Sequence, residues 1–448
     1  MSRDADVFID APISRDRSGG MDSYQQLQQQ VRDFIKAQQL AVETLSDEQL
    51  SDLLKAALQQ LIQQHQLSSS LTEEARNVLQ QRLLDDLIGL GPLEPLLRDP
   101  EVSEIMVNGP SQVYVERHGQ LNPSEVAFAD EDALRRVIER IVAGVGRRVD
   151  QASPMTDARL RCGARVNVII PPLAVDGSCI TIRKFSRQIL GAGDLIQSKS
   201  CSRQLIEFLR LAVESKLNII VCGGTGTGKT TLLNILANWI AANERVITIE
   251  DSAELQLNHH HLVALEARPA NQEGRGEVSI RQLVINALRM RPDRIVVGEC
   301  RGGESLDMLQ AMNTGHAGSL TTLHANTPRD GLRRLEIMVM MAGMDLPLLA
   351  IRQQIASAID MVIQISRLSS GQRFISAVSE VQGLEGEVIS LADIFLAPQY
   401  RGRHANEVSS WLAQATGDIP GFYDRLSGAQ KVAAMDCILP HDEYADVD

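Results

Sequence analysis

The stretch GGTGTGKTT, Gly223 to Thr231, holds phosphate-binding residue types at the spacing GxxxxGK[ST]. It follows the apolar run NIIVC and precedes the helix-like run TLLNILANWIA. Glycines let backbone N–H groups turn toward phosphate oxygens, and the positive end of the following helix points at them. The sequence therefore predicts a P-loop, in which Lys229 neutralises β- and γ-phosphate charge and the Thr230 hydroxyl binds magnesium.

Three acidic side chains, Glu250, Asp251 and Glu254, follow the next apolar run in VITIEDSAEL. Acids at the carboxyl end of a parallel strand face the crevice where ligands bind. A solvated acidic run that caps a helix is an equally good interpretation of these residues alone. Their position one strand after the P-loop favours a functional role, with waters tethered to this cluster helping to hold magnesium.

The stretch DRIVVGECRGGES ends an apolar run at Glu299. An Asp would be expected there to help hold magnesium, but Gly298 precedes the glutamate. A carboxylate at this point can polarise the attacking water. The following run, SLTTLHA, ends at His324, which can bond the γ-phosphate or relay between subunits, although a lone histidine at a strand end is usually structural.

Arginines can supply the added cation that phosphoryl transfer gains from, worth roughly 10³–10⁵ in rate. Arg159, Arg165 and Arg183 occur on or next to expected strands before residue 190, and seven more lie between Arg268 and Arg301. Spacing does not decide which of them reaches phosphate. The run His259–His261 is not expected to be a metal site, because neighbouring side chains on an extended segment point in alternate directions.

The composition indicates an ordinary soluble chain of 448 residues with a net charge of −13. That charge argues against a strong non-specific hold on nucleic acid, and no nucleic-acid partner is expected. Six cysteines occur and no pair forms CxxC, so neither a zinc knuckle nor a redox pair is expected. No signal peptide and no apolar run of about 18 residues appears, so we expect a cytoplasmic protein.

The periodicity divides the chain into segments of different character. Helical spacing before residue 92 predicts a small bundle, short strands around a helix from Glu131 to Ile141 predict an α+β domain, and alternating strands and helices then predict a mostly parallel sheet. The expected strands include EVAF, residues 125–128. The expected segments are a disordered tail (1–20), a helical bundle (21–92), a small α+β domain (93–189), a hinge (190–196), an α/β ATPase domain (197–398) and a divergent C-terminal segment (399–448).

Four motifs in order resemble the secretion-superfamily traffic ATPases: GGTGTGKTT, TIEDSAEL, MRPDRIVVGECRGGES and AMNTGHAGSLTTLHANTP. The nearest resemblance is to the CpaF-type ATPases of tight-adherence (Flp) pili, which SEIMVNGPSQVYVERHGQL and TIRKF also resemble. It extends from about Leu83 to Phe395. In this family a Gly-Glu pair in place of Asp-Glu is the usual pattern, so Gly298-Glu299 is the family's atypical Walker B motif.

The resemblance implies a RecA-like P-loop ATPase domain preceded by a small PAS-like α+β domain, a homohexameric ring, and ATP and Mg²⁺ as cofactors. It also implies a motor at the inner face of the inner membrane that acts on pilus platform proteins. The implied catalytic residues are Glu299, Glu250, Glu254, His324 and Arg183, and the implied magnesium ligands are Thr230 and Asp251. The implied nucleotide-binding residues are Gly223, Gly224, Thr225, Gly226, Thr227, Gly228, Lys229, Thr230, Thr231, Arg159, Arg165 and His316.

Two other functions stay open at this point. A type IV secretion or conjugation ATPase would have the same chemistry, so its site residues would not differ. A nucleotide-gated scaffold built on the same fold would assemble on ATP without releasing phosphate. The presence of Lys229, Thr230, Glu299 and His324 favours hydrolysis over the scaffold.

Overall fold

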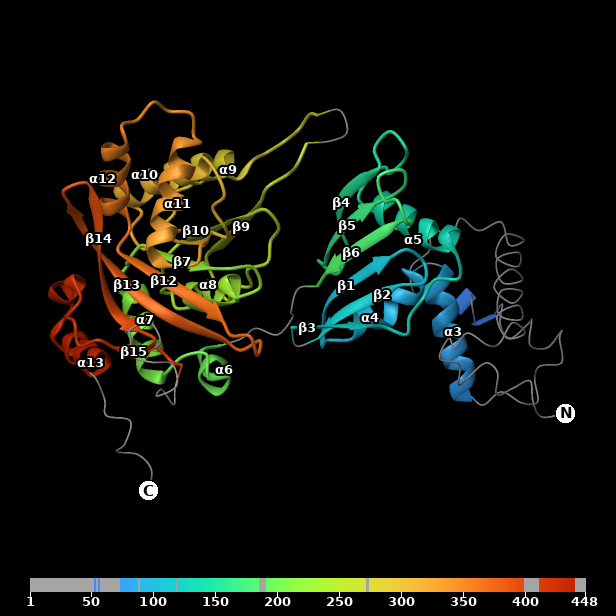
Figure 1. Ribbon diagram of the computed structural model, residues 1–448, viewed down its shortest axis with the longest axis horizontal. Coiled ribbons are helices and arrows are strands. Elements are labelled where there is room, and N and C mark those ends of the chain that lie inside the picture. The colour runs from blue at the N-terminus through green and yellow to red at the C-terminus, as the bar shows by residue number, and fades with distance from the viewer. Residues whose placement is uncertain are drawn as a thin grey trace, which may run out of the picture. The chain divides into compact units, whose positions relative to one another are not determined.

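The computed structural model describes residues 52–53, 55–56, 73–87, 89–117, 119–184, 191–270, 274–398 and 411–439. The chain divides into two compact units, unit 1 (Met1–Arg187) and unit 2 (Gln188–Asp448), and Figure 1 labels their elements. Among the described residues, no helix is long and apolar enough to cross a membrane.

Unit 1 is built on a six-stranded antiparallel sheet in the order β3-β2-β1-β6-β5-β4. Its strands are β1 (Val102–Asn108), β2 (Val113–Arg117), β3 (Gln120–Pro123), β4 (Met155–Arg159), β5 (Arg165–Ile169) and β6 (Cys179–Arg183). Its helices are α3 (Glu73–Leu87), η4 (Gly91–Leu93), α4 (Glu94–Arg98) and α5 (Glu131–Ala143).

One face of this sheet carries the core of unit 1. Buried side chains alternate along the strands, as Val166 and Val168 do on β5, and pack with the apolar side of α5. Helix α5 begins at Asp130, whose side chain accepts a hydrogen bond from the Ala133 N–H. The residues between the buried ones point to the opposite face, which is the usual arrangement of a sheet packed on one side.

In unit 1, one expected strand is absent from the described residues and two strands were not expected. Residues 125–128, EVAF, form no strand: Phe128 is buried, and its N–H donates to the Pro110 carbonyl outside any ladder. Strands β3 and β4 were not expected, because their sequences QLNP and MTDAR lack an apolar alternation and their side chains are exposed or half-buried. Backbone pairing with β2 and β5 holds them in place.

Unit 2 is built on a nine-stranded sheet in the order β15-β14-β13-β12-β7-β11-β10-β8-β9. The strands from β12 to β9 in this order are parallel, and β13, β14 and β15 add antiparallel strands at the other side. The strands are β7 (Ile219–Gly223), β8 (Val246–Glu250), β9 (Leu262–Glu266), β10 (Arg294–Val297), β11 (Leu320–His324), β12 (Met361–Arg367), β13 (Arg373–Glu385), β14 (Val388–Leu396) and β15 (Gln414–Ala415).

Helices cover both faces of this sheet, as expected for buried parallel strands (Figure 1). Side chains such as Ile219 and Val221 pack with α7, α8 and α13 in one core, while Ile220 and Cys222 pack with α9, α10, α11 and α12 in the other. The helices are α6 (Ala192–Gln197), α7 (Arg203–Glu214), α8 (Lys229–Ala237), α9 (Ile280–Ala287), α10 (Glu304–Asn313), α11 (Pro328–Met340), α12 (Leu348–Ala358), η7 (Gly421–Arg425) and α13 (Gly428–Ile438). The α/β prediction is confirmed.

The segments expected from the sequence can be compared with the elements of the structure in three places. Most of the predicted bundle (21–92) and the whole predicted tail (1–20) lie outside the described residues, although α3 matches the helix expected to stop at Gly89. The predicted hinge, 190–196, is largely helical, because α6 occupies residues 192–197. Residues 411–439 of the divergent segment belong to unit 2, where β15 extends the sheet and Phe422 packs against Phe208.

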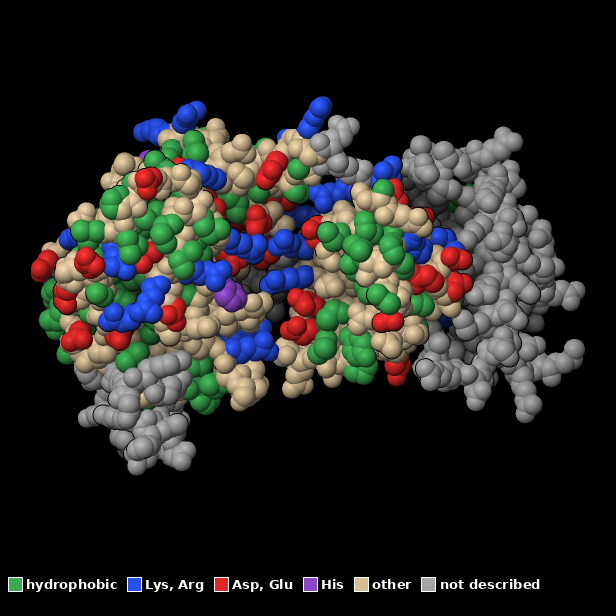
Figure 2. Space-filling view, turned by 45° about the horizontal axis from the view of Figure 1, so that its top comes forward, with side chains coloured by type: hydrophobic (Ala, Val, Ile, Leu, Met, Phe, Trp, Pro, Cys, Tyr) green, Lys and Arg blue, Asp and Glu red, His purple; other side chains and the backbone are tan. Residues whose placement is uncertain are grey.

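The surface of unit 2 is mixed in character. Basic, acidic and hydrophobic side chains are interspersed over the face seen in the space-filling view (Figure 2). The net charge of −13 is therefore not spread as a uniform acidic field on this face.

A buried arginine secures the amino-terminal edge of the parallel strands. Arg294, at the start of β10, is fully buried and pairs with Glu244, while it donates to the carbonyls of Gly318 and Val213, each at 2.9 Å. A Cβ at Gly318 would lie 1.8 Å from the Arg294 guanidinium. Only glycine therefore fits beside this ion pair.

The Gly318→Ala variant is predicted to be at least about 3 kcal/mol less stable than the wild type, because Arg294 must leave a buried, paired position. Gly315→Ala is a matched control in the same loop. Gly315 has a φ of +107° and Gly318 a φ of +82°, but a Cβ at Gly315 would meet nothing within 4 Å. It should lose only about 1–2 kcal/mol through backbone strain. Urea unfolding measures both values, and equal losses would contradict this account of Arg294.

Candidate active site

The parallel strands of unit 2 end at one edge of the sheet, where the P-loop, the predicted acidic residues and His324 lie. β11 lies between β7 and β10, and β8 lies beyond β10. The P-loop and Glu299 are thus two strand spacings apart, or about 10 Å.

The P-loop has the backbone of a phosphate cradle. Gly226 and Gly228 have φ values of +69° and +98°, which side chains other than glycine rarely adopt. Helix α8 begins at Lys229, whose amine donates to the Gly224 carbonyl at 2.9 Å. A Cβ at Gly223 would lie 2.5 Å from the Thr227 hydroxyl, so the loop turns too tightly for any larger residue. The remaining predicted members, Thr225, Thr230 and Thr231, lie on this loop or in the first turn of α8.

Glu250 explains why glycine precedes Glu299. Glu250 ends β8, and its neighbour across the ladder is Gly298, whose N–H donates to the Ile249 carbonyl. A Cβ at 298 would lie 2.9 Å from the Glu250 Cγ. The glutamate side chain therefore occupies the space that an aspartate at 298 would need.

The Glu250 carboxyl group orders the start of the acidic loop. It is only 4% exposed and accepts hydrogen bonds from the backbone N–H groups of Glu254 and Leu255, at 3.0 and 3.1 Å. Burial raises the pKa of Glu250 to about 7, and the charges of Glu254 and Glu266 add to the rise. Near neutral pH this carboxyl group is close to half protonated. The structure thus gives Glu250 a scaffolding contact in addition to its predicted catalytic role.

Arg301 joins the two acids at the mouth of the site. Its guanidinium donates to Glu299 at 2.6 and 2.8 Å and to Asp251 at 3.1 Å. Neither carboxylate is buried, and the arginine itself is largely exposed. The pairing holds Glu299 and Asp251 together at the edge where β8 and β10 end.

The two predicted histidines lie at opposite ends of β11. His324 ends the strand beside Gly223 of the P-loop, so it lies at the expected edge. His316 precedes the strand, and its ring nitrogen Nδ1 lies 3.3 Å from the Ala311 carbonyl at the end of α10. The structure therefore does not bring His316 to the P-loop of its own chain. His316 was expected at the site only through the family resemblance, and its place before the run SLTTLHA already puts it at the other end of the strand from His324.

The three arginines of unit 1 form a row. Arg159 on β4 lies beside Arg165 on β5, and Arg165 lies beside Arg183 on β6. Their strand positions place them on the open face of the sheet, opposite the core. Arg183 also lies 3.8 Å from Glu104. Three guanidinium groups side by side make this strip of the sheet basic, and a basic strip attracts anions.

Two further arginines near the P-loop were missed by the sequence analysis. Strand β12 runs parallel to β7, so the β12–β13 turn reaches the P-loop edge. A Cβ at Gly226 would lie 3.6 Å from an Arg367 guanidinium nitrogen, and one at Gly228 would lie 3.7 Å from Arg373 Cδ. An apolar strand that ends in arginine, MVIQISR, was the available signal.

The residues fit ATP and magnesium by the chemistry of their donors. The glycine cradle, Lys229 and the Thr230 hydroxyl at a helix start suit a magnesium-bound triphosphate. Among the described residues, no group of three or more His, Cys, Asp or Glu could hold a metal alone. Mg²⁺ usually keeps several waters and binds through phosphate and one or two protein ligands, a role that the Thr230 hydroxyl suits.

Comparison with known proteins places the chain in a family. Residues 86–391 match the family model described as "Type II/IV secretion system protein". This chain belongs to that family. A Mycobacterium tuberculosis (H37Rv) protein named for conjugal transfer is 39% identical over 312 residues, which cover 68% of this chain and 88% of the relative. The type IV secretion system protein PtlH of Bordetella pertussis is 36% identical over 306 residues, covering 62% and 89%.

A solved structure of the same family is also similar in sequence. The VirB11 ATPase of the Brucella suis type IV secretion system is 31% identical, and the match covers 64% of this chain and 92% of that one, with a TM-score of 0.36. That superposition is too loose to carry an argument about the site. The family match is thus to type II/IV secretion system proteins, and the CpaF-type branch is a finer assignment.

A double-mutant cycle tests the contact between Glu250 and position 298. Gly298→Ala should lower the free energy of unfolding by about 1–3 kcal/mol, because its methyl group overlaps the Glu250 side chain. In a Glu250→Ala background the same substitution should cost much less, since the overlapping atoms are gone. Chemical denaturation of the four proteins gives the coupling. An equal cost in both backgrounds would mean that Glu250 does not exclude larger residues at 298.

Proposed function

We propose that this protein is an ATP-hydrolysing motor that works as a homohexamer at the cytoplasmic face of the inner membrane. It powers assembly or retraction of tight-adherence (type IVc, Flp) pili through membrane platform proteins. The observation that carries the hydrolytic part is the shared edge of β7, β11 and β10, with the P-loop, His324 and Glu299 at their ends. Family membership and motif order support the motor role.

Each residue at the edge has a distinct task in this proposal. The Lys229 amine, which donates to the Gly224 carbonyl in this structure, turns to bind β- and γ-phosphate oxygens. Backbone N–H groups of the loop donate to the other phosphate oxygens. Thr230 and water molecules near Asp251 hold the magnesium ion, which neutralises charge on the phosphates. Glu299 then orients a water molecule for attack on the γ-phosphorus, and His324 bonds the phosphate beside it.

The arginine row of unit 1 supplies the anion-binding surface that the motor needs. Arg183, with Arg165 and Arg159 beside it, senses the γ-phosphate in this proposal. In a ring of six chains, these arginines can contact a nucleotide bound to the P-loop of the same chain or of a neighbouring chain. Loss of the γ-phosphate removes the anion, and the change in attraction moves one unit against the other.

A second candidate is a type IV secretion or conjugation ATPase. It is favoured by the names of the relatives, one assigned to conjugal transfer and one to type IV secretion. The order and chemistry of the motifs serve both functions equally. A strain that lacks this gene separates them: loss of surface pili supports the first function, and normal pili with loss of conjugation or protein export supports the second.

The Glu299→Gln variant should bind ATP like the wild type and hydrolyse it at least about 100-fold more slowly, because the amide cannot accept the proton of water. Equilibrium binding of a fluorescent ATP analogue and phosphate release measure the two properties. Glu304→Gln is a nearby control, since Glu304 accepts N–H bonds from Arg301 and Gly302 and should not touch nucleotide. Normal turnover by Glu299→Gln would remove its assigned role and favour a different base.

The Arg165→Ala variant should lower the turnover number of the assembled protein at least about 10-fold, through loss of phosphate attraction. Its unfolding free energy should stay within about 0.5 kcal/mol of the wild type, since Arg165 lies on the open face of the sheet and not in the core. Arg161→Ala, in the exposed turn between β4 and β5, is the control and should change neither value. Loss of stability together with activity would point to a structural role for the row.

A further inference from the structure

A group of hydrophobic side chains is exposed on and after α11. Ile337, Met340, Met341 and Met344 are 55%, 48%, 65% and 51% exposed. Ile337 and Met340 lie on the last turn of α11 and Met341 is its C-cap, so the three follow one another at spacings of three and four residues and form a continuous surface. Exposed apolar surface that is continuous in this way marks an interaction site far more often than scattered single residues do.

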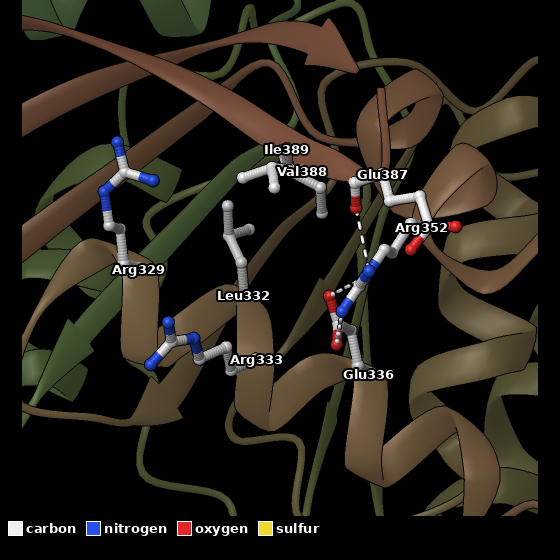
Figure 3. Close-up of a pocket in the computed structure, with 8 residues that line it drawn as sticks. All are labelled: Arg329, Leu332, Arg333, Glu336, Arg352, Glu387, Val388 and Ile389. Atoms are coloured by element: carbon white, nitrogen blue, oxygen red, sulfur yellow. Dashed lines mark hydrogen bonds and ion pairs between the residues drawn. The ribbon is translucent and has the colours of Figure 1, made fainter. Parts of the chain in front are cut away.

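The elements that carry this surface are cross-linked by side-chain contacts. Arg352 of α12 pairs with Glu336 of α11 at 2.9 Å and donates to the Glu387 carbonyl in the β13–β14 turn at 2.8 Å. Figure 3 shows the Arg352 guanidinium between these two partners. One arginine thus ties two helices and a strand turn together, and the surface is formed before any partner arrives.

A small pocket of about 120 Å³ opens beside the same helix. Leu332 of α11 points toward Val388 and Ile389 of β14, and these three side chains form its apolar wall (Figure 3). Val388 is 58% exposed, so the wall continues to the surface. The pocket has room for an apolar side chain of a partner rather than for a nucleotide-sized ligand.

Basic side chains border the pocket. Arg329 and Arg333 extend from the first half of α11 (Figure 3) and line it, and both are exposed, as is Arg334. In the part of the chain that the structure describes, no hydrogen bond or ion pair joins the side chains of these three arginines to another residue. In a protein of net charge −13, a basic border beside an apolar surface attracts acidic partners to this place specifically.

We propose that this surface, the α11 patch (Arg329, Arg333, Ile337, Met340, Met341 and Met344), is a docking site for an acidic amphipathic helix of another protein. The patch runs along a helix of about 20 Å, the length of three to four helical turns. A partner helix would place apolar anchors over the methionines and in the pocket, and its acidic residues over Arg329 and Arg333. Methionine side chains adapt to the shape of such anchors.

The arrangement favours a helix over a lipid surface. The arginines and the apolar residues follow one another along α11, whereas a membrane-binding helix carries its basic residues along the sides of one apolar face. The pocket is also concave, and an inserted side chain fills it where a bilayer surface does not. None of the six patch residues is one of the predicted nucleotide-binding or catalytic residues, so docking there leaves the proposed ATP site open.

The test uses the full-length protein and three labelled peptides of about 18 residues, one helix five turns long. The first peptide has Leu on one face and Glu on the other, the second has Lys in place of Glu, and the third is a scrambled version of the first. Fluorescence anisotropy should show micromolar binding of the acidic peptide and at least tenfold weaker binding of the other two. Equal binding of the acidic and basic peptides would overturn the proposal.

Variants locate the binding. Ile337→Glu and Arg333→Glu should each weaken binding of the acidic peptide at least tenfold. Val432→Glu is the matched control: this valine is also exposed (64%), but it lies on α13. All three variants should hydrolyse ATP at the wild-type rate without peptide, which separates failure of docking from failure of the proposed function. Binding that the patch variants leave unchanged would contradict the assignment.

Other occupants give different results in the same series. If a second copy of this chain covers the patch, Ile337→Glu lowers the mass in solution measured by light scattering, and the peptide does not bind the wild type. If an anionic bilayer covers it, the same variant abolishes sedimentation with phosphatidylglycerol vesicles, and no peptide binds. If a synthetic peptide of residues 46–64 binds more tightly than the acidic probe, the partner is a segment of this chain. Each of these results would overturn the proposal that a helix of another protein docks on the α11 patch.

Discussion

Neighbouring parallel strands that end together are the constraint on which the proposed chemistry depends. Hydrogen bonds join β7 to β11 and β11 to β10, so Gly223, His324 and Glu299 must come to one edge. The fully buried strands that enforce this order have helices packed on both faces. A change in the order of these strands would separate Lys229 from Glu299. The packing of the two cores therefore determines whether the residues at the edge can act together.

Close packing at that edge also decides which residues carry the acids. A Cβ at 298 would lie only 2.9 Å from the Glu250 Cγ, so the carboxylates come from β8 and from position 299 instead. Arg301 then holds Glu299 beside Asp251 through charge-assisted hydrogen bonds. The unusual Gly-Glu pair thus follows from the volume of a neighbouring side chain.

The sequence predicted the features that depend on local pattern. The P-loop, the strands that end at Glu250 and His324, and the α/β class of unit 2 all carry strong signals in spacing and hydrophobicity. It did not predict β3 and β4, which pair through the backbone with little apolar patterning, or the position of His316 at the far end of β11. The arginine row depends on the register of three strands, and register is a long-range property that spacing does not encode.

The most direct test is a structure of the protein with Mg²⁺ and a non-hydrolysable ATP analogue. We expect Lys229 Nζ within about 3 Å of a β- or γ-phosphate oxygen. The Glu299 carboxylate should reach the γ-phosphate through a single water molecule. An analogue bound away from the P-loop, or a Glu299 side chain turned away from the γ-phosphate in every subunit, would contradict the account.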